Sequence, residues 1–376
     1  MNKILLASFS LTLLTGIDVI SVAGVRLSLI PLIIFSVFII MRKRRIPRIS
    51  ILILLFIVAT LPSLLFTYDF QKSFSYVIWT IINFIAIIIP FSYLVSEDKD
   101  NAIRGMLFSF RFQIALGILL FISGVQGRAH LLYYEPSYFA LALTPYILIV
   151  AQRYINQDKK YTYKWDLILV LISLYITKSA NLLLILILSI IVTLFFGKNK
   201  IKSLIVFLII FLILIILAFL YINYSDDLMA DTIRNIISSP DKITSALVRT
   251  GNRWPRLLLT YDIAISHFWG VGLGAFASFT DNHFFPMYVD LPWYLNPLHG
   301  EGMNIYLELA ATGGWISLLL WVVFNIKCIF ISFRNDNQLI GMSLIVILLA
   351  LNIESNIMRP YYWMILGMCM CYPKKI

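Results

Sequence analysis

Long apolar runs, separated by short clusters of charged residues, constrain the fold of this chain more than any other feature. A run of about 20 apolar residues is the length that an α-helix needs to cross a bilayer. The sequence therefore predicts an all-α polytopic membrane protein with about 12 transmembrane helices. The predicted helices lie at 4–22, 25–41, 49–66, 75–95, 105–125, 137–152, 166–177, 179–197, 203–223, 302–324, 338–353 and 357–372.

One large loop separates the ninth and tenth predicted helices. The predicted organisation is residues 1–223 as the first nine helices, 224–301 as an external loop with short helices, and 302–376 as the last three helices. Within the loop we expect a helix at about 253–266, followed by an aromatic- and proline-rich stretch. The apolar content of the loop suggests that it lies against the membrane.

The composition excludes several classes of protein. The 376 residues are 60% hydrophobic and 13% charged, with a mean hydropathy of +0.89. Soluble domains average about 45–50% apolar and about 25% charged residues, so a soluble enzyme, a disordered regulator and a disulfide scaffold are all excluded. The net charge of +11 is not accompanied by a basic, aromatic-interleaved platform. We therefore expect the lipid bilayer as a partner, and no nucleic acid.

The numbers of Lys and Arg on the two sides predict the orientation of the helices. With the N-terminus in the cytoplasm, the inner segments hold 19 of the 30 Lys and Arg residues and the outer segments hold 10. Cytoplasmic loops carry an excess of these residues, so both termini are predicted to be cytoplasmic. All four histidines then lie outside, and all three cysteines lie at inner helix ends. No Cys/His spacing typical of a metal site occurs, and we expect no metal and no other cofactor.

The first candidate cluster lies in the outer segment GRAHLLYYEPSYFA and contains Arg128, His130 and Glu135. A glutamate that enters a membrane helix is costly unless it is paired or functional. Glu135 also directly precedes Pro136, a favoured first residue of a helix, so capping of that helix is an alternative that does not exclude a function.

The second cluster is TKSAN at 177–181, a polar interruption of a long apolar stretch. Two interpretations remain open. The segment is a tight turn between two helices, or Lys178 binds a phosphate at the outer interface.

The third cluster is the segment that begins VRTGNRWPR, with Arg249, Arg253 and Arg256 as candidate ligands of an anion. Asn252 is a plausible N-cap, which would place Arg253 and Arg256 on the first turn of a helix. One guanidinium group can donate two hydrogen bonds to the oxygens of a phosphate, and the free N–H groups at a helix N-terminus are further donors. The alternative is that both arginines reach lipid headgroups from an interfacial helix. The glycine run at 270–274 follows a helix and is expected to allow a close backbone approach.

The fourth cluster is the segment PLHGEGMNIYLELAATGGW, which contains His299, Glu301 and Glu308. A histidine in this position can act as a general base at neutral pH. An interfacial histidine bonded to a carbonyl is the alternative. Glu308 would lie about two turns into a predicted membrane helix, where it needs a partner.

Taken in order, these motifs resemble the O-antigen and capsule polysaccharide polymerases of the Wzy type, which share a superfamily with the O-antigen ligases. EPS at 135–137 resembles a recurrent polymerase motif, and Arg253 with GVGLG at 270–274 resembles a family pattern of an arginine followed by a glycine-rich segment. NIYL at 304–307 resembles the start of a family helix that carries His-Asn. Met303 stands where the family often has that His, and a helical 299–304 would place His299 one turn away on nearly the same face.

The resemblance implies glycosyl transfer between oligosaccharide repeat units linked to undecaprenyl pyrophosphate, on the outer face of the bacterial plasma membrane. That lipid-linked glycan would be both donor and acceptor, and a chain-length regulator protein is a further partner that the resemblance allows. The reaction needs cations for the pyrophosphate and a base for the attacking hydroxyl. The expected substrate-binding residues are Arg128, His130, Lys178, Arg249, Arg253, Arg256, Asn304 and Tyr306, and the expected catalytic residues are His299, Glu135 and Glu301.

Two other functions stay open from the sequence. An O-antigen ligase would use the same donor with a lipid A-core acceptor. A flippase of lipid-linked oligosaccharides would need charged residues along a path through the bilayer and two related halves. We find no internal repeat, and the polar residues gather on one side, which favours the polymerase.

Overall fold

The structure is a computed structural model that describes residues 2–22, 25–44, 46–47, 49–197, 200–224, 228–241, 251–292, 295–355 and 357–370, with part of the side chains in 200–232. These residues form helices and one short antiparallel hairpin, β1 (Ser21–Val22) and β2 (Val25–Arg26). The helices are α1 (Lys3–Thr15), α2 (Leu29–Lys43), α3 (Ser50–Thr60), α4 (Phe70–Asn83), α5 (Ile89–Ile122), α6 (Pro136–Ala142), α7 (Thr144–Asn156), α8 (Asp166–Thr177), α9 (Ala180–Phe196), α10 (Lys200–Tyr224), α11 (Leu228–Ser238), α13 (Arg253–Ser266), α14 (Phe276–His283), α15 (Phe285–Tyr288), α16 (Ile305–Gly313), α17 (Trp315–Arg334), α18 (Gln338–Ala350) and α19 (Pro360–Cys369).

Two helical stretches of the described residues are long and apolar enough to cross a membrane, Phe70–Ile122 and Trp315–Arg334. The bent pair α6 and α7, with an angle of 51° between its two halves, is a third candidate. Five shorter apolar helices accompany them. The structure is thus that of an all-helical protein consistent with a place in a membrane, while the count of 12 spans stays a prediction.

Several predicted spans have different limits in the structure. The first predicted span, 4–22, ends at Thr15 and is followed by the hairpin. The predicted spans 75–95 and 105–125 are separate in the structure, because the backbone departs from helical geometry at Asp98, in the charged segment between them; a π-helical turn joins α4 to the start of α5 within the first of these spans. The predicted span 302–324 is divided at Gly314, whose φ of 89° ends α16 before α17 begins. Apolar periodicity does not record the break at Gly314, because the residues on both sides of it are apolar.

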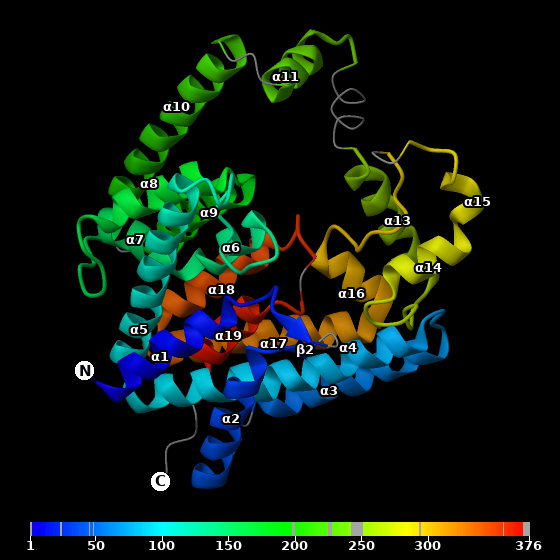
Figure 1. The fold of residues 1–376 in the computed structure, drawn as a ribbon, viewed down its shortest axis with the longest axis horizontal. Helices are drawn as coiled ribbons and strands as arrows, with labels where there is room; N and C mark the ends of the chain where they lie inside the picture. Colours follow the sequence, from blue (N-terminus) through cyan, green and yellow to red (C-terminus); the bar gives the residue numbers. More distant parts are fainter. Residues whose placement is uncertain are drawn as a thin grey trace.

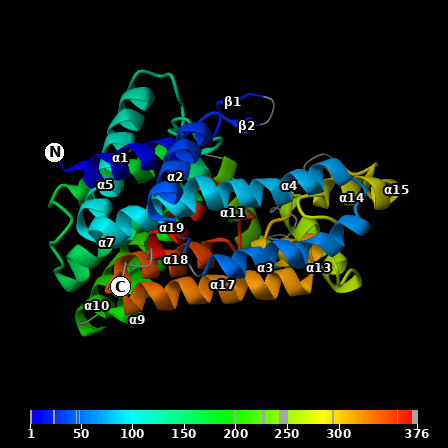
Figure 2. The ribbon, with the colours of Figure 1, turned by 90° about the horizontal axis from the view of Figure 1, so that it is seen from below.

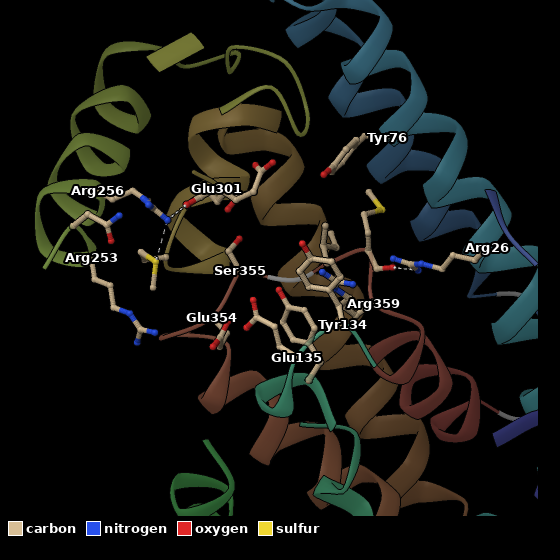
Figure 3. A pocket seen from close by; sticks show the side chains of 17 residues that line it. Arg26, Tyr76, Tyr134, Glu135, Arg253, Arg256, Glu301, Glu354, Ser355 and Arg359 are labelled. Atoms are coloured by element: carbon tan, nitrogen blue, oxygen red, sulfur yellow. Dashed lines mark hydrogen bonds between the residues drawn. The ribbon is translucent and has the colours of Figure 1, made fainter. Parts of the chain in front are cut away.

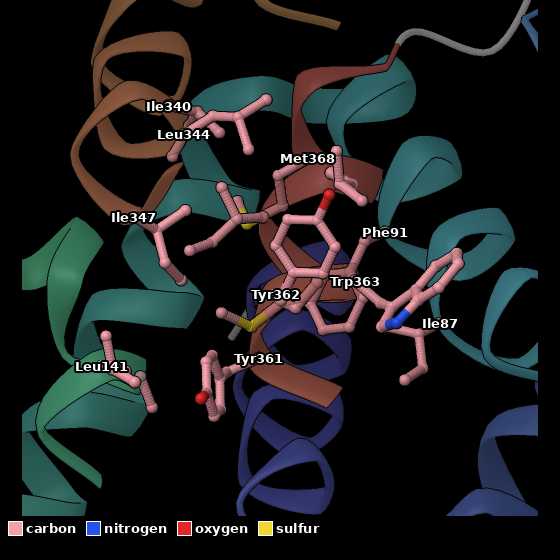
Figure 4. Packing of buried hydrophobic residues seen from close by; sticks show 14 of the residues in the cluster. Ile87, Phe91, Leu141, Ile340, Leu344, Ile347, Tyr361, Tyr362, Trp363 and Met368 are labelled. Atoms are coloured by element: carbon pink, nitrogen blue, oxygen red, sulfur yellow. The ribbon is translucent and has the colours of Figure 1, made fainter. Parts of the chain in front are cut away.

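Helix α19 forms the centre of the fold. All ten of its residues are buried, which suits a helix that is apolar on every side. Figure 4 shows Tyr361, Tyr362 and Trp363 of this helix among Ile87 and other buried residues of the surrounding helices. The N-cap of α19 is Arg359, so the central helix delivers a guanidinium group to the end of the core.

The segment between α9 and α16 rises from the helix cluster and returns to it (Figure 1). The helix expected at about 253–266 is confirmed as Arg253–Ser266. Asn252 is its N-cap residue, as expected, although the Asn252 side chain makes no capping hydrogen bond. After α13 the glycine run lies against α16, where the N–H of Val271 donates to Ala311 O at 2.9 Å. A Cβ on Gly270 would lie 2.4 Å from Thr312 O, so the expected close approach is confirmed.

Apolar side chains cover much of the outer surface of the helix cluster. In α2, Ile34, Phe38 and Met41 are more than half exposed, and α3 presents Ile51 and Val58 in the same way. Figure 2 shows α3 beside α17 at the edge of the molecule. Exposed apolar surface on this scale is unfavourable in water and is normal for helices that face lipid.

Candidate functional site

A cavity of about 570 Å³ lies where the hairpin, the start of α6, α13 and the segments before α16 and α19 meet. Its volume falls in the range of ligand-binding pockets, about 300–1,000 Å³. Its lining carries eight charged side chains, four of each sign: Arg26, Arg253, Arg256, Arg359, Glu135, Glu301, Glu308 and Glu354. Figure 3 shows Arg253 and Arg256 on one side, Arg26 and Arg359 on the other, and Glu135 and Glu354 between them.

The first turn of α13 supplies Arg253 and Arg256. Among the described residues, Arg253 is exposed and has no ion-pair partner. Nη1 of Arg256 donates to the Glu301 carbonyl at 3.3 Å and faces Met303 Sδ at 3.9 Å, whereas its buried Nε has no hydrogen-bond partner. Burial first, then the neighbouring charge of Arg253, lowers the pKa of Arg256 from its usual value. An anion bound in the cavity would offset both effects, because it stabilises the charged form of Arg256.

A buried carboxylate joins the two arginines on the opposite side. Asp18 contacts Arg26 at 3.0 Å and Arg359 at 2.8 Å, and its side chain is 1% exposed. The guanidinium of Arg359 also lies 4.0 Å from the ring centre of Tyr138. One carboxylate between two guanidinium groups leaves a net positive charge on this side as well, and it fixes both arginines in place.

Glu135 and Glu354 lie between the two pairs of arginines. Glu135 occupies the N-cap position of α6, but its side chain makes no cap bond and instead accepts from Ser137 Oγ at 3.1 Å. The expected place of Glu135 at the start of α6 is therefore confirmed, without a capping hydrogen bond from its side chain. Glu354 accepts from Asn181 Nδ2 at 2.8 Å. Burial raises the pKa of Glu354, while the hydrogen bond from Asn181 and the charge of Arg253 lower it and Glu135 raises it further.

Glu301, which precedes α16, and Glu308, in its first turn, line the cavity next to each other. Glu301 pairs with Lys72 at 3.1 Å. Glu308 lies in the first turn of α16, outside the candidate membrane spans, and its Oε2 is buried. Loss of hydration and the nearby charge of Glu301 raise the pKa of Glu308 to about 8. The Glu308 carboxyl therefore keeps its proton to a higher pH than an exposed glutamate does.

The glycines beside His299 make room for these side chains. A Cβ on Gly300 would lie 2.3 Å from Cζ of Arg256, and one on Gly302 would lie 2.5 Å from Oε2 of Glu308. Any larger residue would push the guanidinium or the carboxyl group out of its present position. Both glycines thus make room for side chains that line the cavity.

His299 itself does not line the cavity. It lies in a turn with a φ of 60°, its N–H donates to Asp281 Oδ1 at 2.8 Å, and its ring Nδ1 lies 2.9 Å from Asp281 Oδ2. The side chain is 67% exposed. Residues 299–304 are not helical, because α16 begins only at Ile305, so His299 does not lie one helical turn from position 303. Met303, at the position of the family's histidine, does line the cavity.

Arg128, His130 and Lys178, the remaining candidates of the first two clusters, make local contacts in loops and do not line the cavity. Arg128 donates from Nε to Thr177 O at 3.2 Å and from Nη2 to Lys178 O at 2.9 Å. Lys178 is the C-cap of α8, with a left-handed backbone, which favours the tight-turn interpretation. His130 faces Tyr133 O at 3.1 Å. None of the three lines the cavity, and Arg249 lies outside the described residues.

Asn304 and Tyr306 have structural contacts. Oδ1 of Asn304 caps α16 by accepting from the N–H groups of Tyr306 and Leu307, and its Nδ2 donates to Asn352 O at 2.9 Å. The hydroxyl of Tyr306 donates to Leu348 O at 2.9 Å. Both side chains hold α16 against the end of α18. They thereby position Glu308 without lining the cavity.

The sequence did not assign a role to Asp18, Arg26, Arg359 or Glu354. The position of Asp18 inside a predicted membrane span indicates a paired or functional residue, because a carboxylate there needs a partner. Its partners could not be found by spacing, because Arg359 is 341 residues away in the sequence. Glu308 carried the same signal of an intramembrane carboxylate. A smaller cavity of about 140 Å³ shares Arg26 and Tyr76 with the main cavity, and it too was not expected.

No protein-family model matches this chain, and no curated protein matches it. Its chemistry is therefore argued from the cavity. Within the described residues, no group of three or more His, Cys, Asp and Glu side chains is arranged to hold a metal ion. The cavity offers incompletely bonded guanidinium groups for an anion and carboxyl groups for proton transfer. A phosphorylated substrate whose reaction needs a base would use both.

Proposed function

We propose that this protein is a polysaccharide polymerase of the Wzy type, which joins lipid-pyrophosphate-linked oligosaccharide repeat units. One observation carries the proposal. Three segments that resemble this family, around Glu135, Arg253 and Met303, lie far apart in the sequence and all contribute residues to the lining of the same cavity. Chance similarities in three unrelated segments would have no reason to meet around one charged cavity.

In the proposed reaction, the hydroxyl of the acceptor sugar attacks the anomeric carbon of the donor glycan. A new glycosidic C–O bond forms, the bond between the anomeric carbon and the pyrophosphate oxygen breaks, and undecaprenyl pyrophosphate leaves with both electrons of that bond. Arg253 and Arg256 hold the pyrophosphate and stabilise its developing charge. The buried Nε of Arg256 supplies an unused donor for this purpose.

The proton of the attacking hydroxyl passes to a carboxylate of the cavity, and Glu308 is our first choice. Glu308 lines the cavity, and its raised pKa brings its basicity close to neutral pH, where a general base is most efficient. Glu135 and Glu301 also line the cavity and are the alternatives. His299 is the less favoured base, because its ring is engaged by Asp281 outside the cavity lining.

We also propose that the cavity opens on the outer face of the bacterial plasma membrane, with both termini in the cytoplasm. Polar contacts between distant segments agree with the predicted division of the segments into two sides, because none of those named here joins a predicted outer segment to a predicted inner one; the Lys and Arg counts then assign the outer side. The outer pairs are Lys72–Glu301, Asn181–Glu354 and Arg359–Asp18, and the inner pairs are Lys43–Glu97, Lys160–Asp100 and Lys99–Asp336.

A deletion strain of the host tests the proposed function. If the protein is a polymerase, the strain loses all glycan chains longer than one repeat and keeps the single repeat. If it is an O-antigen ligase, every repeat disappears from the lipid A-core while lipid-linked polymer remains. If it is a flippase, lipid-linked repeats accumulate on the cytoplasmic face. The second and third results would contradict the polymerase.

A further inference from the structure

A second cavity, of about 530 Å³, lies on the part of the molecule that is predicted to face the cytoplasm. It is bounded by α1, by α5 and by the loop between α7 and α8. Four cationic side chains line it, and no carboxylate does: Arg104, Arg111, Lys159 and Lys160. None of these residues takes part in the proposed glycosyl transfer.

Buried polar contacts hold the wall of this cavity in place. Arg111 binds Asp166 with two nitrogens, each at 2.8 Å, and donates from Nη2 to Tyr161 O at 3.0 Å. The same guanidinium lies 4.8 Å from the ring centre of Tyr163. Asp166 also accepts from the hydroxyl of Tyr146 at 2.9 Å. The loop is therefore fixed to α5 and α7 before any ligand binds, as a preformed site requires.

Two of the four cations are neutralised and two are not. Lys160 pairs with Asp100 at 2.7 Å, and Arg111 pairs with Asp166. Arg104 and Lys159 are exposed and have no ion-pair or hydrogen-bond partner among the residues that the structure describes. The nearby Asp158 accepts from the Lys160 backbone N–H and does not line the cavity. An anion between Arg104 and Lys159 would thus meet two free cations.

An apolar, exposed helix face leads away from the cationic rim. Phe108, one turn after Arg104, lines the cavity and is 54% exposed. Phe112, Leu116 and Leu119 continue this face of α5 and are also exposed. Residues at these spacings share one side of a helix. A ligand with a charged head and a long apolar tail fits this combination, whereas a free phosphate would leave the apolar face uncovered.

We propose that this cavity binds the headgroup of an anionic phospholipid, with Arg104 and Lys159 on the phosphate and the acyl chains along the Phe108–Leu119 face of α5. The lipid would fix the loop and α5 at the cytoplasmic surface. Anionic lipids are concentrated where basic residues meet the end of a membrane helix, and each such contact adds to the affinity.

Native mass spectrometry of the purified full chain tests the proposal, with phosphatidylglycerol and phosphatidylcholine of identical acyl chains as probes. We expect the parent to retain one phosphatidylglycerol in preference to phosphatidylcholine. Arg104→Gln combined with Lys159→Gln should reduce that preference about tenfold or more, because two charge-assisted contacts are lost. The control pair Lys327→Gln with Arg334→Gln removes the same charge from exposed residues outside the cavity and should keep the preference.

The charge-conserving pair Arg104→Lys with Lys159→Arg should also retain phosphatidylglycerol, which separates loss of charge from loss of folding. Equal retention of the two lipids by the parent would overturn the proposal. An equal loss in the control pair would overturn it too, because the effect would then follow net charge alone. Competition by soluble glycerol phosphate as effective as that by phosphatidylglycerol would show an anion site without a lipid.

Discussion

The guanidinium of Arg256 is held among apolar and backbone groups with a buried Nε that no described residue satisfies. We predict that Arg256→Ala weakens binding of a lipid-linked pyrophosphate about ten- to hundredfold, the usual effect of losing a charge-assisted bond. Arg256→Lys should also be impaired, since a point charge cannot replace the planar fork. Equilibrium binding of undecaprenyl pyrophosphate measures this effect. Lys178→Gln, an outer lysine away from the cavity, is the control and should bind normally.

Glu308 gives the proposed reaction a specific dependence on pH. Its pKa is raised from 4.5 to about 8, so the carboxyl is mostly protonated at pH 7 and becomes a base as the pH rises. We predict that the polymerisation rate increases through pH 6–8 and then levels off, and that Glu308→Gln lowers it about 10²–10⁴-fold. A rate that is lost in Glu135→Gln or His299→Ala instead, with Glu308→Gln active, would assign the base to that residue.

The raised pKa of Glu308 has the opposite effect on folding stability. The folded state holds this proton more tightly than the unfolded chain does, so stability falls as the pH rises from about 4.5 to 8. The structure of the protein must therefore be monitored across the same pH range, for example by circular dichroism. A rate that rises while stability falls separates catalysis from folding.

The sequence identified charged outer residues that could bind and react with a substrate. It did not predict which of them lie together around one cavity. Glu135, Arg253, Arg256 and Glu301 were expected at the site and line the cavity. His299 was expected there because its residue type suits a base. The left-handed backbone of His299 and the contact of its ring with Asp281 hold the side chain away from the cavity lining. Neither feature can be predicted from the spacing of residues in the sequence.

At the scale of the elements, the glycine run after α13 fixes that helix against α16. We predict that Gly270→Ala lowers the apparent Tm in detergent by about 4 °C or more, because a φ of 80° and a Cβ only 2.4 Å from Thr312 O both disfavour it. Gly127→Ala is the matched control, since its Cβ would have no neighbour within 4 Å and should leave the Tm unchanged. Equal stability of the two variants would contradict the docking of α13 on α16.

Element limits followed the sequence where local signals mark them. The helix at 253–266 was predicted at its observed limits, because a polar, glycine-containing segment precedes it and a glycine run follows. The break at Gly314 was not predicted, whereas the break at Asp98 falls in the charged segment between the predicted spans 75–95 and 105–125. Apolar runs report that a segment is buried in lipid or protein. They do not report where tertiary packing bends it.

At the scale of the whole molecule, the proposed orientation places α13 outside and the loop between α7 and α8 inside. We predict that Asp262→Cys is labelled by an impermeant thiol reagent in intact spheroplasts, whereas Asp158→Cys is labelled only after lysis. Both aspartates are exposed, so accessibility within the protein is matched. The reverse labelling pattern would place the charged cavity on the cytoplasmic side and would contradict the polymerase as proposed.

The most direct measurement is polymerisation by the purified protein. Lipid-linked single repeats, isolated from the deletion strain of the same host, would be incubated with it in detergent, and the released glycans separated by size. We predict chains of several repeats, together with free undecaprenyl pyrophosphate, and no such chains with Glu308→Gln or Arg256→Ala. Repeats that remain single with the folded parent protein, or that are transferred only to an added lipid A-core, would contradict the account.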